Sequence, residues 1–305
     1  MLWQQYAKAF VEDSGRVVDD YHKMTHSEGQ GSGMLFAVMA NDRTAFERIY
    51  SWTERHLRRP DGLYAWKWQD GRVADINNAS DGDILIAWSL LKAYEAWGDE
   101  VFLQKSLALL DAIKLLLVTR EYGFTVLLPG SLYYEKPERT VINPSYIVLP
   151  ALVDFARYDD ATFWNGFYQD SLQLLKRASA LGQGVTTDWM QVSEQGLAYS
   201  EEHDPVFGYD AIRVPLYLAW ANERALLQPY LSLWNKLGGV DKAPSTYHLL
   251  DGGRSAYSPE HGIVAIRKLA ANLPLPNEPG VAAQGYYSSS LVLFAHLASH
   301  SQAHP

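Results

Sequence analysis

Residues 83–117 read DILIAWSLLKAYEAWGDEVFLQKSLALLDAIKLLL, and this stretch decides the predicted fold. On both sides of the GDE at 98–100, apolar residues recur at spacings of three and four, which is the period of an amphipathic helix. The pattern predicts one helix over 83–97 and a second over 100–117. Because the connection is so short, we expect the two helices to form a hairpin.

Helical periodicity continues over most of the chain. It is strong at 42–57, and weaker versions bring the total to about eleven helices. The weaker segments are 2–13, 29–40, 144–158, 160–179, 209–221, 224–237, 257–270 and 285–299. Strand-like stretches such as YGFTVLLPG (122–130) are few and short, and no linker or change of composition divides the sequence. We therefore predict one all-α domain over 1–305, with long polar loops.

The predicted helices come in pairs, with short turns at 40–42, 98–100 and 158–160. Repeated helical hairpins form either an open solenoid or a closed ring. In a ring, the same end of every inner helix faces one central hollow. Polar residues stand where four of the pairs begin, at intervals of 53, 65 and 64 residues: Glu28, Asp81, Tyr146 and Asp210. A ring would bring them together, although acidic residues at helix starts also serve as ordinary caps.

The composition narrows the classes of partner. With 26 basic and 35 acidic residues the formal charge is −9, which disfavours nucleic acid and anionic membranes. The chain has 10 Trp, 19 Tyr and 10 Phe, which suit a sugar-like or planar ligand or an aromatic core. Without cysteine there are no disulfides or thiolate metal sites. No apolar run reaches the roughly 18 residues of a membrane span, and MLWQQYAKAF at the N-terminus has no signal-peptide pattern.

The glycine-rich stretch THSEGQGSGM (25–34) does not match a nucleotide loop. It lacks the lysine of a phosphate loop and the third glycine of a dinucleotide fingerprint. The glycines instead indicate close backbone packing or close approach of a ligand. Thr25 and Glu28 have the spacing of a capping box. His22 and His26 lie four residues apart, but without a third ligand we expect no metal there.

Six segments, in this order across residues 25–295, carry a family resemblance: HSEGQGSGM, NNASDGDILIAWSLL, LLPG, NPSY, YDAIRVP and GYYSSSLVLF. Together they resemble the family 8 glycoside hydrolases. The resemblance implies an (α/α)6 barrel and endo-hydrolysis of β-1,4-glucan with inversion of configuration. It also implies a periplasmic or secreted location and a link to the bacterial cellulose synthase machinery. We expect no cofactor and no metal.

The same resemblance implies roles for single residues. Glu28 of SEGQ matches the family's general acid, and Asp210 of YDAIR its general base. Asp81 of SDGD matches the carboxylate that positions the sugar at the cleavage subsite, and Tyr146 of NPSY a tyrosine near the attacking water. Because a helix N-terminus favours an ionised carboxylate, we expect burial and the charge of Asp81 to keep the proton on Glu28. Arg213, three residues after Asp210, is expected to pair with it.

Aromatic side chains are the expected sugar platforms. The candidates are Trp66, Tyr209, Tyr286 and Tyr287, with Trp68 as a weaker one. The sequence departs from the family pattern at two places. Gly31 and Ser32 stand where relatives have Ser-Tyr, which brings a subsite into question, and Leu216 stands where many have Trp.

Other functions fit the same residues. Xylan, chitosan or mixed-linkage β-glucan are alternative substrates within the family. Outside enzymes, the alternatives are a sugar-binding protein with an inactive site and a helical-repeat interaction protein. An open solenoid predicts that Glu28 and Asp210 lie far apart, whereas a barrel predicts that they face one another.

Overall fold

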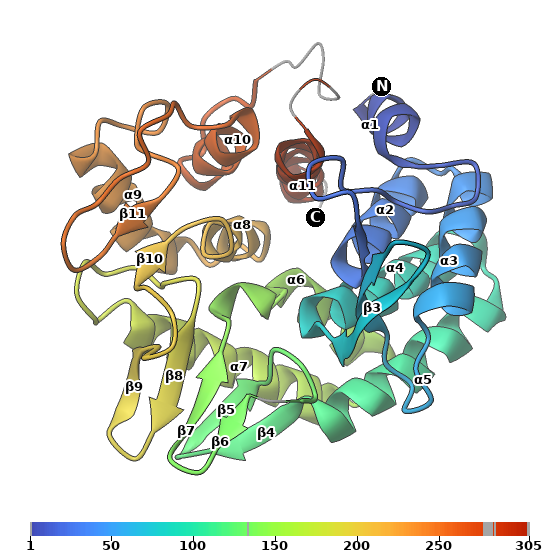
Figure 1. Cartoon of the computed structure of the whole chain (residues 1–305), viewed down its shortest axis with the longest axis horizontal. Helices are drawn as coiled ribbons and strands as arrows, with labels where there is room; N and C mark the ends of the chain where they lie inside the picture. The colour runs from blue at the N-terminus through green and yellow to red at the C-terminus, as the bar shows by residue number, and fades with distance from the viewer. Residues whose placement is uncertain (1, 133, 277–282, 284, 304–305) are drawn as a thin grey trace.

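A computed structural model describes residues 2–132, 134–276, 283 and 285–303. In this part of the chain eleven α-helices form two concentric layers (Figure 1). The inner layer consists of α2 (Ser27–Met39), α4 (Ser80–Trp97), α6 (Leu149–Tyr158), α8 (Arg213–Trp220), α10 (His261–Ala270) and α11 (Tyr286–Ala303). The outer layer consists of α1 (Leu2–Phe10), α3 (Arg43–Leu57), α5 (Glu100–Leu116), α7 (Ala161–Ala178) and α9 (Gln228–Lys236).

The layers close into a ring, and the fold is the (α/α)6 barrel predicted from the sequence. The N-terminal helix α1 packs against both α2 and α11, so the two ends of the chain meet. The hydroxyl groups of Tyr6 and Ser290 are hydrogen bonded across this junction. The prediction of a closed ring is therefore confirmed, and the open solenoid is excluded.

The hairpin of residues 83–117 forms as its sequence predicts. Helix α4 ends at Gly98, whose positive φ of 68° suits a residue without a side chain. The side chain of Asp99 then accepts a hydrogen bond from the backbone N–H of Val101 and starts α5. The predicted helix ranges agree with the observed ones within a few residues. At 144–158 and 224–237, short 3₁₀ helices, η1 (Pro144–Tyr146) and η2 (Arg224–Leu227), precede α6 and α9.

Helices α2 and α4 are buried on nearly every face, because they lie between the outer helices and the rest of the inner ring. Their backbones approach closely where the sequence supplies glycine. A Cβ atom at Gly31 would lie 2.8 Å from Cβ of Leu85. A Cβ atom at Gly82 would lie 2.2 Å from Oγ of Ser27 and 2.7 Å from the backbone N of Glu28. The prediction that these glycines permit close packing is thus confirmed at Gly31.

The sequence underestimated the amount of β-structure, which forms four small antiparallel sheets in the described residues. The strands are β1 (Thr25–His26), β2 (Ala65–Gln69), β3 (Arg72–Asn78), β4 (Val118–Glu121), β5 (Phe124–Leu127), β6 (Glu135–Lys136), β7 (Arg139–Ile142), β8 (Met190–Ser193), β9 (Gly196–Tyr199), β10 (Val206–Phe207) and β11 (Tyr247–His248). Strands of two to seven residues are too short to show a clear alternating pattern. The stretch at 122–130 did predict part of one hairpin, β4–β5.

These strands position the starts of the inner helices. β1 leads directly into α2, β3 ends two residues before α4, and β10 ends shortly before the turn that begins α8. The sheets therefore gather at the end of the barrel where the inner helices begin. In the described part of the chain, no helix is long and apolar enough to cross a membrane.

Candidate active site

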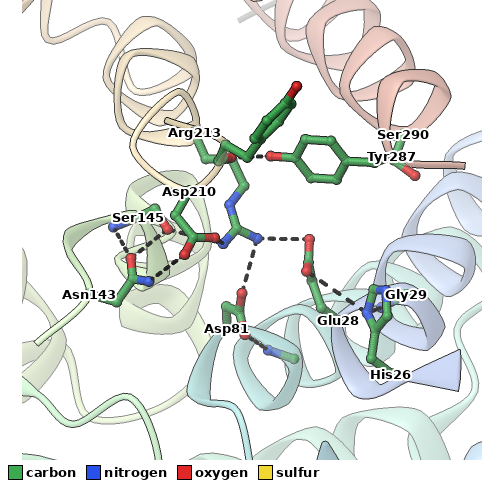
Figure 2. Close-up of polar contacts among 12 residues, drawn as sticks. His26, Glu28, Gly29, Asp81, Asn143, Ser145, Asp210, Arg213, Tyr287 and Ser290 are labelled. Carbon is green, nitrogen blue, oxygen red and sulfur yellow. Dashed lines mark hydrogen bonds and ion pairs between the residues drawn. The ribbon is translucent and has the colours of Figure 1, made fainter. Parts of the chain in front are cut away.

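Three carboxylates from distant parts of the sequence meet at one guanidinium group (Figure 2). Nη1 of Arg213 lies 2.8 Å from Oε1 of Glu28 and 3.0 Å from Oδ2 of Asp81. Nη2 of Arg213 lies 2.9 Å from Oδ1 of Asp210. The guanidinium is almost completely buried, with 2% of the side chain exposed. The barrel therefore brings together the three acidic residues selected from the sequence.

Each of these side chains stands at or near the start of an inner helix. Glu28 and Asp81 lie in the first turns of α2 and α4, while Asp210 lies in the turn before α8 and Arg213 is the first residue of that helix. The predicted pairing of Asp210 with Arg213 is confirmed. The contacts of Arg213 with Glu28 and Asp81 were not predicted, since they join residues 185 and 132 positions apart.

The shared guanidinium limits the distance between the two candidate catalytic carboxyl groups. The terminal nitrogens of the planar guanidinium are about 2.3 Å apart, so Oε1 of Glu28 and Oδ1 of Asp210 are at most about 8 Å apart. An inverting glycosidase needs about 6.5–9.5 Å between its carboxyl groups to leave room for a water molecule. The upper limit falls inside this range.

Asp81 is the most deeply buried carboxyl group of the cluster. Burial raises its pKa to about 7, and the negative charges of Glu28 and Asp210 act in the same direction, while Arg213 opposes them. Of its side chain 3% is exposed, against 21% for Glu28.

The buried Arg213 remains a cation. Burial alone would lower its pKa, but Glu28, Asp81 and Asp210 outweigh burial and hold the pKa well above its ordinary value. The cluster thus contains one permanent positive charge facing three groups that can each carry a negative charge. The charge state of Asp81 therefore depends on the charges of Glu28, Asp210 and Arg213 around it.

Asn143 is a further member of the site that sequence reasoning missed. Its Nδ2 atom donates a hydrogen bond of 2.9 Å to Oδ2 of Asp210. Its Oδ1 atom accepts from the backbone N–H and the hydroxyl of Ser145, and that hydroxyl also contacts Nη2 of Arg213. Both oxygens of Asp210 are therefore held, one by Arg213 and one by Asn143. The only sequence signal was its place as the first residue of NPSY, directly before a predicted helix.

The cap of α2 differs from the prediction. Nδ1 of His26, and not the hydroxyl of Thr25, accepts the backbone N–H of Gly29 at 3.0 Å. The Thr25 hydroxyl instead donates to the backbone oxygen of Val17. Burial lowers the pKa of His26, so this histidine is a neutral acceptor that lies 3.9 Å from Oε2 of Glu28. The capping-box prediction was wrong because Thr25 lies in β1, where its hydroxyl bonds to Val17 and not to the start of α2.

The ring of Tyr146 lies against the cluster, with the guanidinium carbon of Arg213 at 5.5 Å from its centroid. Burial and the nearby carboxylates raise the pKa of Tyr146 well above its usual value, so its hydroxyl keeps its proton. The edge of this ring meets Trp189, with centroids 6.2 Å apart. Tyr146 therefore lies between Arg213 of the cluster and the ring of Trp189.

Comparison with known proteins identifies the family of the chain. The family model "Glycosyl hydrolases family 8" matches residues 1–301. The chain belongs to glycosyl hydrolase family 8. An endoglucanase of Cellulomonas uda is 32% identical over 280 residues, which covers 90% of this chain and 78% of that protein. A probable endoglucanase of Novacetimonas hansenii is 32% identical over 311 residues, covering 97% and 89%. The crystal structure of endoglucanase Cel10 from Klebsiella pneumoniae superposes with a TM-score of 0.93 at 32% identity, covering 99% of both chains.

In this family 8 glycoside hydrolase, two of the expected aromatic platforms lie beside the cluster. The rings of Tyr209 and Tyr287 meet edge to face with centroids 5.8 Å apart, and the Tyr287 hydroxyl donates to the carbonyl oxygen of Tyr209. The Tyr209 hydroxyl donates to Glu260 at 2.8 Å. Both tyrosines are partly exposed and adjoin the candidate base.

The remaining expected platforms differ in how much of each ring is exposed and in what it packs against. Tyr286 is 3% exposed and packs against the core, with His26 at 5.3 Å between ring centroids, so it presents no face to a ligand. Trp66 is partly exposed on β2, the strand that pairs with β1 just before Glu28. Trp68 is also partly exposed, but its ring packs against Trp52 at 5.6 Å.

The two departures from the family pattern are packing features in the family 8 barrel. Gly31 and Ser32 are buried, and Gly31 faces α4, so neither lines a sugar-binding surface. Leu216 is fully buried in α8.

The loop between α7 and α8 supplies residues that the sequence did not single out. Trp189 stacks on Tyr134 and on His203, with centroid distances of 6.0 Å and 4.7 Å. Asp188, next to it, bonds to the turn that carries Asp210. Loop residues have no helical period, so only their aromatic or acidic character could have drawn attention to them.

Proposed function

We propose that this glycoside hydrolase is an endo-β-1,4-glucanase that cleaves cellulose or a related β-1,4-glucan with inversion. The observation that carries the proposal is the meeting of Glu28, Asp81 and Asp210 at Arg213. Glu28 and Asp210 are at most about 8 Å apart there, which allows the separation of about 6.5–9.5 Å of an inverting pair. Support for the substrate comes from the relatives of known name, which are endoglucanases.

Glu28 is the proposed general acid. A protonated carboxyl group keeps one oxygen as an acceptor, so Oε1 of Glu28 can hold the N–H of Arg213 while Oε2 carries the proton. Oε2 lies 3.9 Å from Nδ1 of His26, whose pKa is lowered by burial. When the glycosidic bond breaks, the proton moves to the leaving oxygen, which departs as a hydroxyl group.

Asp210 is the proposed general base. Arg213 and Asn143 each hold one of its oxygens, which aims the carboxylate. A water molecule between the carboxylate and the sugar loses one proton to Asp210 as its oxygen bonds to the anomeric carbon. Attack from the face opposite to the leaving group gives an α-configured product from a β-linkage. Exchange with solvent then restores the proton on Glu28 and removes that on Asp210.

Asp81 is the proposed positioning group for the sugar at the cleavage point. Its Oδ1 atom accepts the backbone N–H of Gly82 at 2.8 Å and its Oδ2 atom contacts Arg213, so its orientation is fixed from both sides. Tyr146, Tyr209 and Tyr287 supply partly exposed rings around the cluster, and Trp66 supplies another on β2. Flat apolar rings suit the faces of glucosyl units.

Reducing-sugar release from carboxymethylcellulose, xylan, chitosan and mixed-linkage barley glucan, measured side by side, tests the substrate. We expect the highest kcat/KM on carboxymethylcellulose. A clear preference for xylan, chitosan or barley glucan would replace the proposed substrate with that polymer. Binding of cello-oligosaccharides without hydrolysis of any of the four would indicate a sugar-binding protein instead.

The proposal extends to location and partners. A periplasmic or secreted enzyme acting beside the cellulose synthase machinery follows from the family resemblance of the sequence. Cell fractionation with an antibody to the chain tests the location. Recovery in the cytosolic fraction alone would contradict it.

A further inference from the structure

Asp188 is bonded to both ends of the turn that carries Asp210. Its Oδ1 atom accepts the backbone N–H of Gly208 at 3.0 Å and that of Ala211 at 2.7 Å. These two N–H groups flank Tyr209 and Asp210 in the sequence. One carboxylate oxygen thus links the N–H groups on either side of Tyr209 and Asp210, the two residues that reach the candidate active site.

The fit between Asp188 and this turn is close. A Cβ atom at Gly208 would lie 2.5 Å from Oδ2 of Asp188, so the side chain lies directly against the glycine backbone. The backbone N–H of Asp188 also donates to the carbonyl oxygen of Val206, at 2.8 Å. The segment is therefore tied to the turn through its backbone as well as through its side chain.

The position is costly for a carboxyl group. Burial raises the pKa of Asp188 to about 7, the charge of Asp210 raises it further, and the N–H groups of Ala211 and Gly208 and the charge of Arg213 lower it. A buried acid close to another acid is unfavourable when both are ionised. A neutral, apolar residue would avoid this cost but would leave two backbone N–H groups without their acceptor.

We propose that Asp188 is a positioning residue for Asp210, which holds the backbone of the Gly208–Ala211 turn while Arg213 and Asn143 hold the Asp210 side chain. The proposal rests on the proposed role of Asp210 as general base. Side-chain bonds can aim a carboxylate only if its backbone is fixed. A displacement of about 1 Å in such a group costs about 100-fold in rate.

The neighbouring residue extends this role. Trp189 packs edge to face on Tyr146, the ring that lies against Arg213. The dipeptide Asp188-Trp189 therefore contacts the Gly208–Ala211 turn with one side chain and Tyr146 with the next.

The test compares Asp188→Ala with Asp188→Asn at pH 6, below the pKa of Asp188. Asparagine keeps an oxygen that can accept both N–H groups, and at this pH both it and the native side chain are mainly neutral. We expect Asp188→Ala to lower kcat about 100-fold with KM within about twofold, and Asp188→Asn to keep kcat within about fivefold. Asp204→Ala is the matched control, since Asp204 is exposed in the same loop, and its activity should be unchanged.

Three results would overturn the proposal: Asp188→Ala retaining more than half of the native kcat, equal losses in Asp188→Ala and Asp188→Asn, or a loss confined to KM. If Asp188→Ala does not fold, Asp188→Asn still decides, because a loss above about tenfold in this folded variant contradicts a role limited to accepting the N–H groups. Failure of the proposed function is a separate result. It would appear as full activity of Asp210→Asn or as a native protein that hydrolyses none of the glucans.

Discussion

Nη1 of Arg213 lies 2.8 Å from Oε1 of Glu28, although 185 residues separate them in the sequence. The contact is one of three that Arg213 makes to carboxyl groups, and it crosses the inner ring from the start of α8 to the start of α2. The closed barrel is therefore what assembles the site. Changes to this one guanidinium should act on all three acids together.

Arg213→Lys should lower kcat/KM by about 100-fold. A lysine carries a single compact charge and cannot reproduce the planar fork that contacts three carboxyl groups through two nitrogens. The measurement is steady-state hydrolysis of carboxymethylcellulose, with circular dichroism to show that the variant is folded. Arg157→Lys is the control, because Arg157 is 62% exposed and pairs with Asp154 away from the cluster. An Arg213→Lys enzyme as active as this control would show that the fork is not needed.

Glu28→Gln and Asp210→Asn should each lower kcat by about 1,000-fold or more. The amides keep the shape of the side chains but can neither donate nor accept the proton that the reaction moves. Melting temperatures should remain within a few degrees of the native value. Glu47→Gln, on the exposed face of α3, is the matched control and should be fully active. Near-normal turnover by Glu28→Gln or Asp210→Asn would remove that residue from its proposed role.

Gly82→Ala should destabilise the protein by about 1–3 kcal/mol. The added methyl group would lie 2.2 Å from Oγ of Ser27 and 2.7 Å from the backbone N of Glu28, so α2 and α4 must move apart. Gly166→Ala on α7 is the control, because nothing lies within 4 Å of the new methyl group and alanine favours a helix by about 1 kcal/mol. Urea unfolding of both variants measures the difference. Equal shifts in the same direction would contradict the close helix contact.

Unfolding free energy should fall by about 2 kcal/mol between pH 7 and pH 8.5. Burial raises the pKa of Asp83 to about 8, and those of Asp81 and Asp188 to about 7. The folded protein keeps protons on these groups that the unfolded chain has already released, because ordinary aspartates titrate near 3.9. As pH rises through the folded pKa values, the stability that these protons provide is lost.

Between pH 7 and pH 8.5 the change in stability reports these three aspartates and not His26, since His26 has a lowered pKa and is neutral there in the folded state. Urea unfolding at several pH values gives the slope. Asp83→Asn, which removes the group with the highest of the three pKa values, should abolish more than half of the change. A native protein whose stability rises over this range would contradict the buried acids.

The helices and the catalytic candidates could be predicted from the sequence because both follow a regular pattern. A period of 3.6 residues marks each helix, and the hairpin repeat indicated a ring in which Glu28, Asp81 and Asp210 would meet. The contact between Asp210 and Arg213 was also predictable, since residues three positions apart in a helical turn lie on the same side.

The parts that could not be predicted depend on contacts between distant segments. Asn143 reaches Asp210 from 67 residues away, and its place in NPSY did not show which residue it would contact. Asp188, 22 residues before Asp210, reaches the turn that carries it from a loop in which nothing local distinguishes it. The capping error at Thr25 has the same origin. The local spacing favoured Thr25, but pairing of β1 with β2 directed the chain so that His26 became the cap.

Proton NMR of a cello-oligosaccharide during its first minutes of hydrolysis tests the central claim most directly. An inverting mechanism with Glu28 as acid and Asp210 as base predicts that the new reducing end appears first as the α-anomer, before mutarotation adds the β-anomer. Initial appearance of the β-anomer would show a retaining double displacement and contradict the account.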